Sequence, residues 1–293
     1  KDVVTQQPTR GLSLPFPTLS DLLYGVRLGE IIALGAGTGI GKTDVFTQII
    51  AHFVKVHREK CGVFYMEQMP RETATRIAGK LAGKTFHIPD SGWTLDDFTV
   101  AWDELQKGGE VFLYDSFGMN EWDVVKDKIE YLAHAEGVRY FFLDHLTALA
   151  AAEESEKEAL ERIMAEMGGM VKRLNITIFL ISHLATPEGK PHEEGGRVMI
   201  RHFKGSRAIG FWCHYMIGLE RDQQHEDPAM RSITTVRVLK DRYTGRATGA
   251  TFYLGYDRET GLLFETDLPG EAQEATDYGF DTPNTSSPQA TDF

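Results

Sequence analysis

The feature that most constrains the fold is a glycine-rich turn set between a short apolar run and an apolar-periodic segment. The turn reads Ala36-Gly37-Thr38-Gly39-Ile40-Gly41-Lys42-Thr43, after Glu30-Ile31-Ile32-Ala33-Leu34 and before residues 45–56. Successive backbone N–H groups of such a turn converge on a phosphate chain, and the following helix adds the positive end of its dipole. The stretch therefore predicts a strand, a phosphate loop and a helix within an α/β domain.

The predicted phosphate-binding residues are Gly37, Thr38, Gly39, Ile40, Gly41, Lys42 and Thr43. In this interpretation Lys42 reaches the outer phosphates, and the Thr43 hydroxyl holds Mg²⁺. The strict pattern begins with Gly where this chain has Ala36, but the remaining glycines still supply the backbone freedom that the loop needs. The alternative is a glycine-rich turn that happens to precede a helix.

Three further apolar runs end in polar side chains, namely Glu67, Asp144 and His183. Ligands of open parallel sheets bind at the carboxyl ends of the strands, so these groups are expected beside the phosphate loop. There Glu67 would deprotonate the water that attacks the terminal phosphate, and Asp144 would be the metal-side carboxylate. His183 would hydrogen-bond the terminal phosphate. The alternatives are a surface Glu, a capped strand end and a structural His.

The order of the predicted elements changes along the chain. Helices are expected over 71–81, 121–136 and 155–174, whereas 214–219, 233–240, 251–256 and 262–264 read as consecutive strands. This pattern predicts a mainly parallel sheet flanked by helices, with an antiparallel extension at one edge. A capping box at Thr18-Leu19-Ser20-Asp21 predicts a short helix. We divide the chain into a linker segment (1–24), the α/β domain (25–266) and an acidic tail expected to be disordered (267–293).

Charge narrows the possible partners. The chain of 293 residues has a formal net charge of -12, which argues against a general polyanion binder. Seven of the acidic residues lie after position 264, so the rest of the chain is less acidic and can still carry basic patches. The stretch 189–207 is locally basic, and its candidate DNA contacts are Lys190, Arg201, Lys204, Gly205, Ser206 and Arg207. A solvated basic loop without a partner is the alternative. No run approaches the about 18 apolar residues that span a bilayer, so no membrane partner is expected. The two cysteines lie in apolar runs, which suits buried reduced thiols, so a cytoplasmic protein is expected.

These motifs together resemble a known family, the RecA-like hexameric helicases of the DnaB-like group, and within it the helicase half of phage primase-helicases of the T-seven type. The resemblance covers about residues 11–264. It rests on the phosphate loop, the strand ending at Glu67, Leu143-Asp144-His145, Ser182-His183-Leu184, His192-Glu193-Glu194-Gly195, Lys204-Gly205-Ser206, Leu219-Glu220-Arg221, Leu239-Lys240-Asp241-Arg242 and Glu259-Thr260-Gly261. Many ordered matches are more specific than any single motif.

The resemblance implies a homo-hexameric ring that hydrolyses NTP (ATP or dTTP) with Mg²⁺ and moves 5′ to 3′ along single-stranded DNA at the replication fork. It implies that Glu67 is the catalytic carboxylate, Asp144 the metal-side acid and His183 the phosphate sensor. It further implies that Arg242 is an arginine finger given to the adjacent subunit, with Lys240 beside it, and that Arg221 and Tyr256 flank the nucleobase. The compartment would be the cytoplasm of an infected bacterial host.

The C-terminal tail ends in an aromatic residue, Phe293, next to the acidic Asp292. Related phage helicases end in an acidic tail with a final Phe that docks on the replicative DNA polymerase, so the resemblance implies the same for Phe293; a solubilising tail is the alternative. The segment 210–214 does not match the relatives, and no role is carried over to it. Two other function classes stay open, namely a nucleotide-switched single-stranded DNA-binding protein without unwinding activity and a small-molecule kinase.

Overall fold

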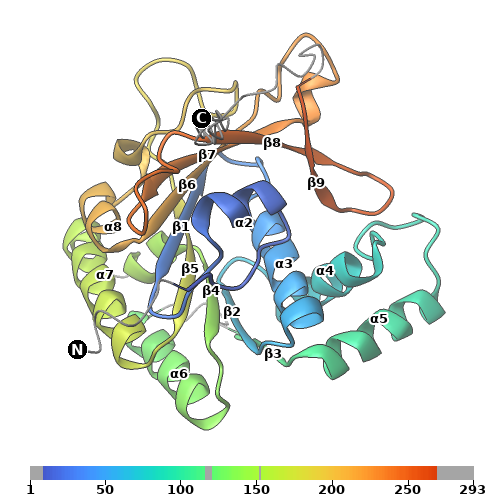
Figure 1. The fold of residues 1–293 in the computed structure, drawn as a ribbon, viewed down its shortest axis with the longest axis horizontal. Helices are drawn as coiled ribbons and strands as arrows, with labels where there is room; N and C mark the ends of the chain where they lie inside the picture. The colour runs from blue at the N-terminus through green and yellow to red at the C-terminus, as the bar shows by residue number, and fades with distance from the viewer. Residues whose placement is uncertain (1–8, 116–120, 152, 269–293) are drawn as a thin grey trace, which may run out of the picture.

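The computed structural model describes residues 9–115, 121–151 and 153–268, and its centre is one nine-stranded sheet (Figure 1). The spatial order of the strands is β3-β2-β4-β5-β1-β6-β7-β8-β9. Their bounds are β1 Ile31–Ala36, β2 Cys61–Tyr65, β3 Val111–Leu113, β4 Tyr140–Asp144, β5 Thr177–His183, β6 Tyr215–Glu220, β7 Thr234–Asp241, β8 Thr251–Tyr256 and β9 Leu263–Thr266.

The strands from β3 to β6 run parallel, and β7, β8 and β9 add an antiparallel edge. The predicted fold class is therefore confirmed. One assignment within it was wrong, because β6 pairs parallel with β1, with Leu219 opposite Ala36, and belongs to the parallel part of the sheet. β6 is a run of residues that are all buried, as is typical of parallel strands, whereas β7 alternates along most of its length between buried and partly exposed residues. The boundary was therefore readable, but the prediction placed the start of the antiparallel edge one strand too early.

Helices cover both faces of the sheet. The α-helices are α2 Pro17–Leu23, α3 Lys42–His52, α4 Pro70–Ala82, α5 Leu95–Gly108, α6 Trp122–Ala135, α7 Glu156–Arg173 and α8 Ser206–Trp212. Short helical turns are the π-helical η1 Phe53–His57 and the 3₁₀ turns η2 Leu146–Ala150, η3 Ile200–His202 and η4 Met230–Ser232. Figure 1 shows α6, α7 and α8 on one side of the sheet and α2 and α3 on the other.

The core is split into two layers by the alternation of side chains along the strands. On β4, Phe142 joins the cluster under α2 and α3, whereas its neighbours Phe141 and Leu143 join the cluster under α6 and α7. Phe142 stacks on Phe179 of β5 with ring centroids 4.6 Å apart. Strands buried on both faces read as continuous apolar runs, which is why these segments were recognisable in the sequence.

The first described residues are part of this core. Leu12 pairs with Val26 in an isolated bridge, and Phe16 is buried against the sheet. The helix predicted near Thr18 is present as α2, but the predicted capping box is wrong, because α2 begins with Pro17 after Phe16. Thr18 instead donates its backbone N–H and its hydroxyl to the Glu265 carboxylate, so it ties the N-terminal helix to the end of β9.

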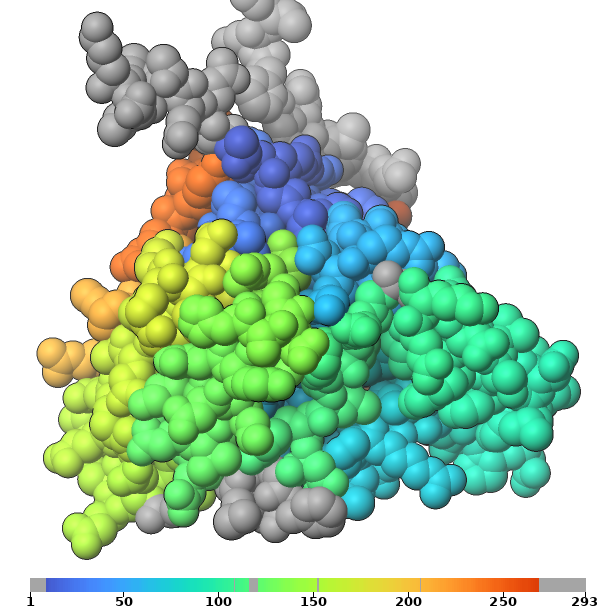
Figure 2. All heavy atoms as spheres, turned by 90° about the horizontal axis from the view of Figure 1, so that it is seen from below, coloured from blue at the N-terminus to red at the C-terminus, as the bar shows by residue number. Residues whose placement is uncertain are grey.

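Helix α5 was missed from the sequence although it carries a capping box of its own. The Thr94 side chain accepts a hydrogen bond from the Asp97 N–H, and the Asp97 carboxylate accepts one from the Thr94 N–H. Figure 2 shows the α5 region at the side of the molecule away from α7.

Within the described residues, no helix is both long and apolar enough to cross a membrane. The predicted tail lies outside these residues from position 269 on, Phe293 included.

Candidate active site

The phosphate loop connects β1 to α3 at the carboxyl edge of the sheet. Gly39 and Gly41 have φ values of +73° and +102°, which are conformations that favour glycine. The Lys42 ammonium folds back over the loop and donates to the carbonyls of Ala36 and Gly37 at 3.1 and 2.9 Å. Burial lowers the pKa of Lys42, whereas the neighbouring carboxylates of Asp144, Glu67 and Glu193 favour its charged form. The Lys42 ammonium therefore lies on the loop with three carboxylates nearby.

A hydroxyl and a carboxylate meet at the start of α3. Thr43 Oγ1 donates to Asp144 Oδ2 at 2.5 Å, so the end of β4 contacts the first turn of α3. Burial raises the pKa of Asp144, and the hydrogen bond from Thr43 opposes this rise. A hydroxyl and a carboxylate are hard oxygen donors of the kind that Mg²⁺ prefers beside substrate phosphates. The donor set therefore fits Mg²⁺, and Thr43 and Asp144 are the residues that would hold it.

The third acid, Glu67, follows β2 and reaches towards the ends of β4 and β5. Its side chain is 67% exposed, and its Oε1 lies 3.0 Å from Nε2 of His145. The His145 ring stacks on that of His183, with centroids 3.8 Å apart and planes 25° apart. Burial lowers the pKa of His183, and the nearby His145 and Lys42 lower it further. The site thus places an exposed carboxylate beside two stacked imidazole rings.

Glu67, His145 and His183 have potential ligand atoms within 4.8 Å of one another, which raises the question of a metal bound by these three. Nearly parallel stacked rings direct the in-plane lone pairs of their nitrogens side by side, whereas one ion needs ligands that converge from different directions. The arrangement suits a hydrogen-bonded cluster better than a second metal centre.

A pocket of about 200 Å³ lies between the phosphate loop and the chain that follows β5. Gly37, Lys42 and His183 line one part of it, and Glu193 and Lys204 line another. The Glu193 carboxylate accepts a hydrogen bond from the Thr38 N–H at 3.1 Å. An acidic side chain therefore accepts the hydrogen bond of one loop amide that the sequence assigned to phosphate.

The two residues expected to flank a nucleobase both border the first turn of α3. Arg221, just after β6, donates to the Ile40 carbonyl and, at 2.9 Å, to Thr234 Oγ1. Tyr256 ends β8, and the Lys80 ammonium lies 5.8 Å from its ring centroid. Lys80 in turn pairs with Asp44 at 2.8 Å. Both residues therefore lie near the phosphate loop, although they are distant from it in sequence.

The structure places Lys240 and Arg242 at the end of the sheet where the parallel strands begin. The phosphate loop lies at the other end, where these strands finish. β7 runs antiparallel to β6, so Lys240 faces Met216 near the beginning of β6, whereas the loop follows the strand end level with Leu219. The Lys240 ammonium donates to the carbonyls of Gly210 and Cys213 at 2.5 and 2.7 Å, and Arg242 donates to the Phe211 carbonyl at 2.9 Å. The segment 210–214, to which the resemblance carried no role, thus accepts these cations at the end of α8.

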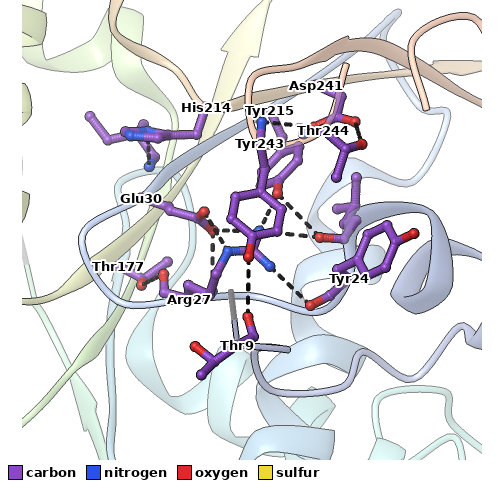
Figure 3. A network of polar contacts seen from close by, with 12 residues as sticks. Thr9, Tyr24, Arg27, Glu30, Thr177, His214, Tyr215, Asp241, Tyr243 and Thr244 are labelled. Carbon is purple, nitrogen blue, oxygen red and sulfur yellow. Dashed lines mark hydrogen bonds and ion pairs between the residues drawn. The ribbon is translucent and has the colours of Figure 1, made fainter. Parts of the chain in front are cut away.

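The turn that follows β7 is anchored from two sides (Figure 3). Asp241 accepts hydrogen bonds from the N–H groups of Tyr243, Thr244 and Ala247 at 2.9 to 3.2 Å. Although burial opposes it, the hydrogen bonds from Thr244 and the backbone hold the pKa of Asp241 below its usual value.

The second anchor of this turn is Tyr243. The Arg27 guanidinium lies 3.7 Å from the Tyr243 ring centroid and pairs with Glu30 at 2.8 Å. Arg27 follows α2 and Glu30 precedes β1, so the turn that presents Arg242 is fastened to the N-terminal part of the domain (Figure 3).

The predicted DNA contacts are only partly gathered together. Lys204 borders the pocket, and its N–H donates to the His183 carbonyl at 3.0 Å. Gly205 has φ +77° and caps α8, which begins at Ser206, and Arg207 is exposed in the first turn. Arg201 is exposed on η3, and Lys190 pairs with Asp222 at 3.2 Å.

Sequence reasoning missed His145 and Glu193 as members of the site. His145 belongs to the motif Leu143-Asp144-His145 and Glu193 to the motif His192-Glu193-Glu194-Gly195, and His145 directly follows the predicted metal-side acid. That adjacency was the available signal for His145. Glu193 offered no local signal, since its partner Thr38 lies 155 positions away.

Comparison with known proteins identifies the family of this chain. The DnaB-like helicase C terminal domain family matches residues 11–260. The DNA helicase/primase of Enterobacteria phage T3 is 32% identical over 278 residues, covering 92% of this chain and 48% of that protein. The chain thus spans about half the length of this relative.

Solved structures share the fold at low sequence identity. One of them, described as an ATPase domain, has a TM-score of 0.74 at 17% identity, over 91% of this chain and 95% of its own. A DnaB-like replicative helicase, described with its interactions with primase, also has a TM-score of 0.74 at 17% identity, over 91% and 66%. A KaiC-like protein of Pyrococcus horikoshii OT3 has a TM-score of 0.61 at 15% identity, over 89% and 100%. With the family match over most of its length, the chain belongs to the DnaB-like helicase C-terminal domain family.

Proposed function

We propose that this chain is the motor domain of a replicative DNA helicase, which hydrolyses NTP, translocates 5′ to 3′ along single-stranded DNA and displaces the paired strand. The observation that carries the proposal is the convergence of Lys42, the Thr43–Asp144 pair and Glu67 at the carboxyl ends of neighbouring strands. Phosphoryl transfer needs this combination, because its catalysis consists mainly of positioning and of neutralising charge on the phosphates. The name of the phage T3 relative supports coupling of this chemistry to DNA.

In the proposed reaction the phosphates of ATP or dTTP lie along the amides of residues 37–43, with Lys42 on the outer phosphates. Mg²⁺ held by Thr43 and Asp144 would neutralise charge on the phosphate oxygens. Glu67 orients and deprotonates the attacking water, and His183 hydrogen-bonds the terminal phosphate. Arg221 and Tyr256 flank the base. Glu193 must leave the Thr38 N–H for the phosphates to occupy that amide.

We further propose that the active assembly is a homo-hexameric ring. The position of Arg242, at the sheet edge opposite its own phosphate loop, supports a role as an arginine finger for the adjacent subunit. A groove of about 710 Å³ between α4 and α5 supports association, because it is lined by Phe86, Trp93, Phe98 and the 76% exposed Leu95. Exposed apolar grooves of this kind mark protein interfaces. Lys240, held by two carbonyls of its own chain, would support α8 beside the finger.

A strand-displacement assay tests the proposed function. We expect NTP-dependent release of the paired strand from a forked DNA, and hydrolysis that is stimulated by single-stranded DNA. Hydrolysis that DNA does not stimulate would favour a small-molecule kinase. Nucleotide-dependent DNA binding without strand displacement would favour a nucleotide-switched DNA-binding protein. Either result would contradict the motor.

Neutralising Lys190, Lys204 and Arg207 together should weaken single-stranded DNA binding for all sequences alike. For every interaction with a phosphate that is removed, the log-log slope of affinity against salt should fall by about 0.7, because fewer counterions are released on binding. Fluorescence anisotropy over a salt series measures this slope. Replacement of Lys107 and Lys128, which are exposed on α5 and α6, is the matched control. An unchanged slope in the triple variant would show that the basic loop faces solvent.

The contact between the acidic tail and the replicative DNA polymerase remains a prediction from the sequence. We propose that Phe293 and the neighbouring carboxylates dock into a basic, partly apolar pocket of that enzyme. Titration of the isolated tail peptide against the polymerase checks this without the avidity of several tails on one ring. Salt-insensitive or absent binding, together with no effect of Phe293→Ala in the assembly, would contradict it.

A further inference from the structure

The hydrogen bonds of His145 define which of its nitrogens carries the proton. Nδ1 accepts the N–H of Ala148 at 3.2 Å, as the side-chain cap of η2, and lies 2.6 Å from the Thr147 hydroxyl. A backbone N–H can only donate, so Nδ1 must present its lone pair, and the Thr147 hydroxyl donates to it as well. In the neutral ring the proton therefore sits on Nε2.

This tautomer makes His145 a fixed donor towards Glu67. Nε2 lies 3.0 Å from Glu67 Oε1, so the N–H bond points at the carboxylate, and hydrogen bonds to a charged acceptor are stronger than those between neutral groups. Glu67 follows β2 in an exposed turn and would otherwise be free to rotate into solvent. His145 is buried and held on its other side by η2. The rigid partner thus restrains the mobile one.

We propose that His145 is a positioning residue for Glu67, which orients the carboxylate and couples it to His183. The inference rests on the proposed function, since it assumes that Glu67 is the base for NTP hydrolysis. The stacked contact between His145 and His183 carries the coupling, because the two rings lie 3.8 Å apart and one cannot tilt without moving the other. A terminal phosphate bound at His183 would therefore set the ring that orients the base.

Two substitutions separate this role from a purely structural one. Asn places its side-chain oxygen near the position of Nδ1, so His145→Asn keeps the acceptor for the Ala148 N–H but is too short to reach Glu67. Gln places its amide nitrogen near the position of Nε2, so His145→Gln keeps a donor for Glu67 but disturbs the cap of η2. A positioning residue and a capping residue therefore predict opposite orders of activity for the two variants.

We expect His145→Asn to lower kcat for NTP hydrolysis by about 10- to 100-fold, because a displacement of about 1 Å at a reacting group can cost about 10²-fold. KM and the affinity for a non-hydrolysable analogue should change little. His145→Gln should retain much of kcat while its thermal stability falls. The assay uses the full chain with single-stranded DNA, and the wild type and Glu67→Gln are measured beside it.

The outcomes are distinguishable. If the wild type does not hydrolyse NTP, the proposed function itself is wrong. If the wild type is active but Glu67→Gln retains its activity, the base has been wrongly assigned and the positioning role of His145 is wrong with it. If those two controls behave as expected but His145→Asn keeps the wild-type kcat, the positioning role is wrong. Loss of activity in His145→Gln with retention in His145→Asn would assign His145 to the cap of η2 alone. Parallel losses of kcat and analogue binding in both variants would also overturn the inference.

Discussion

Glu67→Gln is expected to lower the turnover of NTP by about 10²- to 10⁴-fold, the usual contribution of a general base. Nucleotide binding should remain nearly intact, because the substitution removes the base but leaves the cradle around Lys42 unchanged. Single-turnover hydrolysis in the presence of single-stranded DNA measures the first effect, and titration with a non-hydrolysable analogue measures the second. This split between kcat and binding is the signature of a group that acts only in the transition state.

Two comparisons control this experiment. Glu72→Gln removes an exposed carboxylate from the first turn of α4 and should leave turnover unchanged. Lys42→Ala should weaken both binding and turnover, because the ammonium contacts the phosphates before and during the reaction. A near-wild-type rate in Glu67→Gln would show that the base has been wrongly assigned.

Arg242→Ala should depress turnover by about 10³-fold or more if its guanidinium stabilises transition-state charge as an arginine finger. The effect should act between subunits, since Arg242 lies at the sheet edge opposite its own phosphate loop. Mixing Arg242→Ala subunits with Glu67→Gln subunits would create some interfaces with both an intact base and an intact finger. Steady-state hydrolysis of the mixture should therefore recover part of the missing activity.

Arg246→Ala is the matched control, because Arg246 is an exposed cation on the same turn. It should change turnover little. Exchange between the two kinds of subunit has to be verified, for example by energy transfer between labelled chains. Absence of recovery in subunits that do exchange would argue that Arg242 acts within its own chain or does not act.

The parts of the site that could be predicted are those written in contiguous residues. The phosphate loop is one such part, because its glycines, Lys42 and Thr43 follow one another directly in the sequence. Asp144 and Glu67 were also predictable, since each follows an apolar run and parallel strands end at one edge. Their nearness to Lys42 follows from the sheet order, in which β2, β4, β5 and β1 are consecutive.

What could not be predicted depends on contacts between distant segments. The partner of Glu193 is an amide of the phosphate loop, and the partner of Arg27 is a ring in the turn after β7. Neither pair leaves a periodic pattern in the sequence. β6 and α5 were failures of another kind, because their signals were readable. β6 is buried along its whole length, as is typical of parallel strands, whereas β7 alternates along most of its length. Helix α5 has its cap at Thr94.

The antiparallel course of β7 has a consequence for how the proposed NTP hydrolysis should be measured. Because β7 carries Arg242 away from the edge where β1 presents the phosphate loop, a single chain holds the cradle at one end and the proposed finger at the other. A lone subunit then has a phosphate cradle without a finger and a finger without a cradle. Turnover per chain should consequently fall on dilution, with a reaction order above one in protein, until single-stranded DNA or nucleotide holds the subunits together.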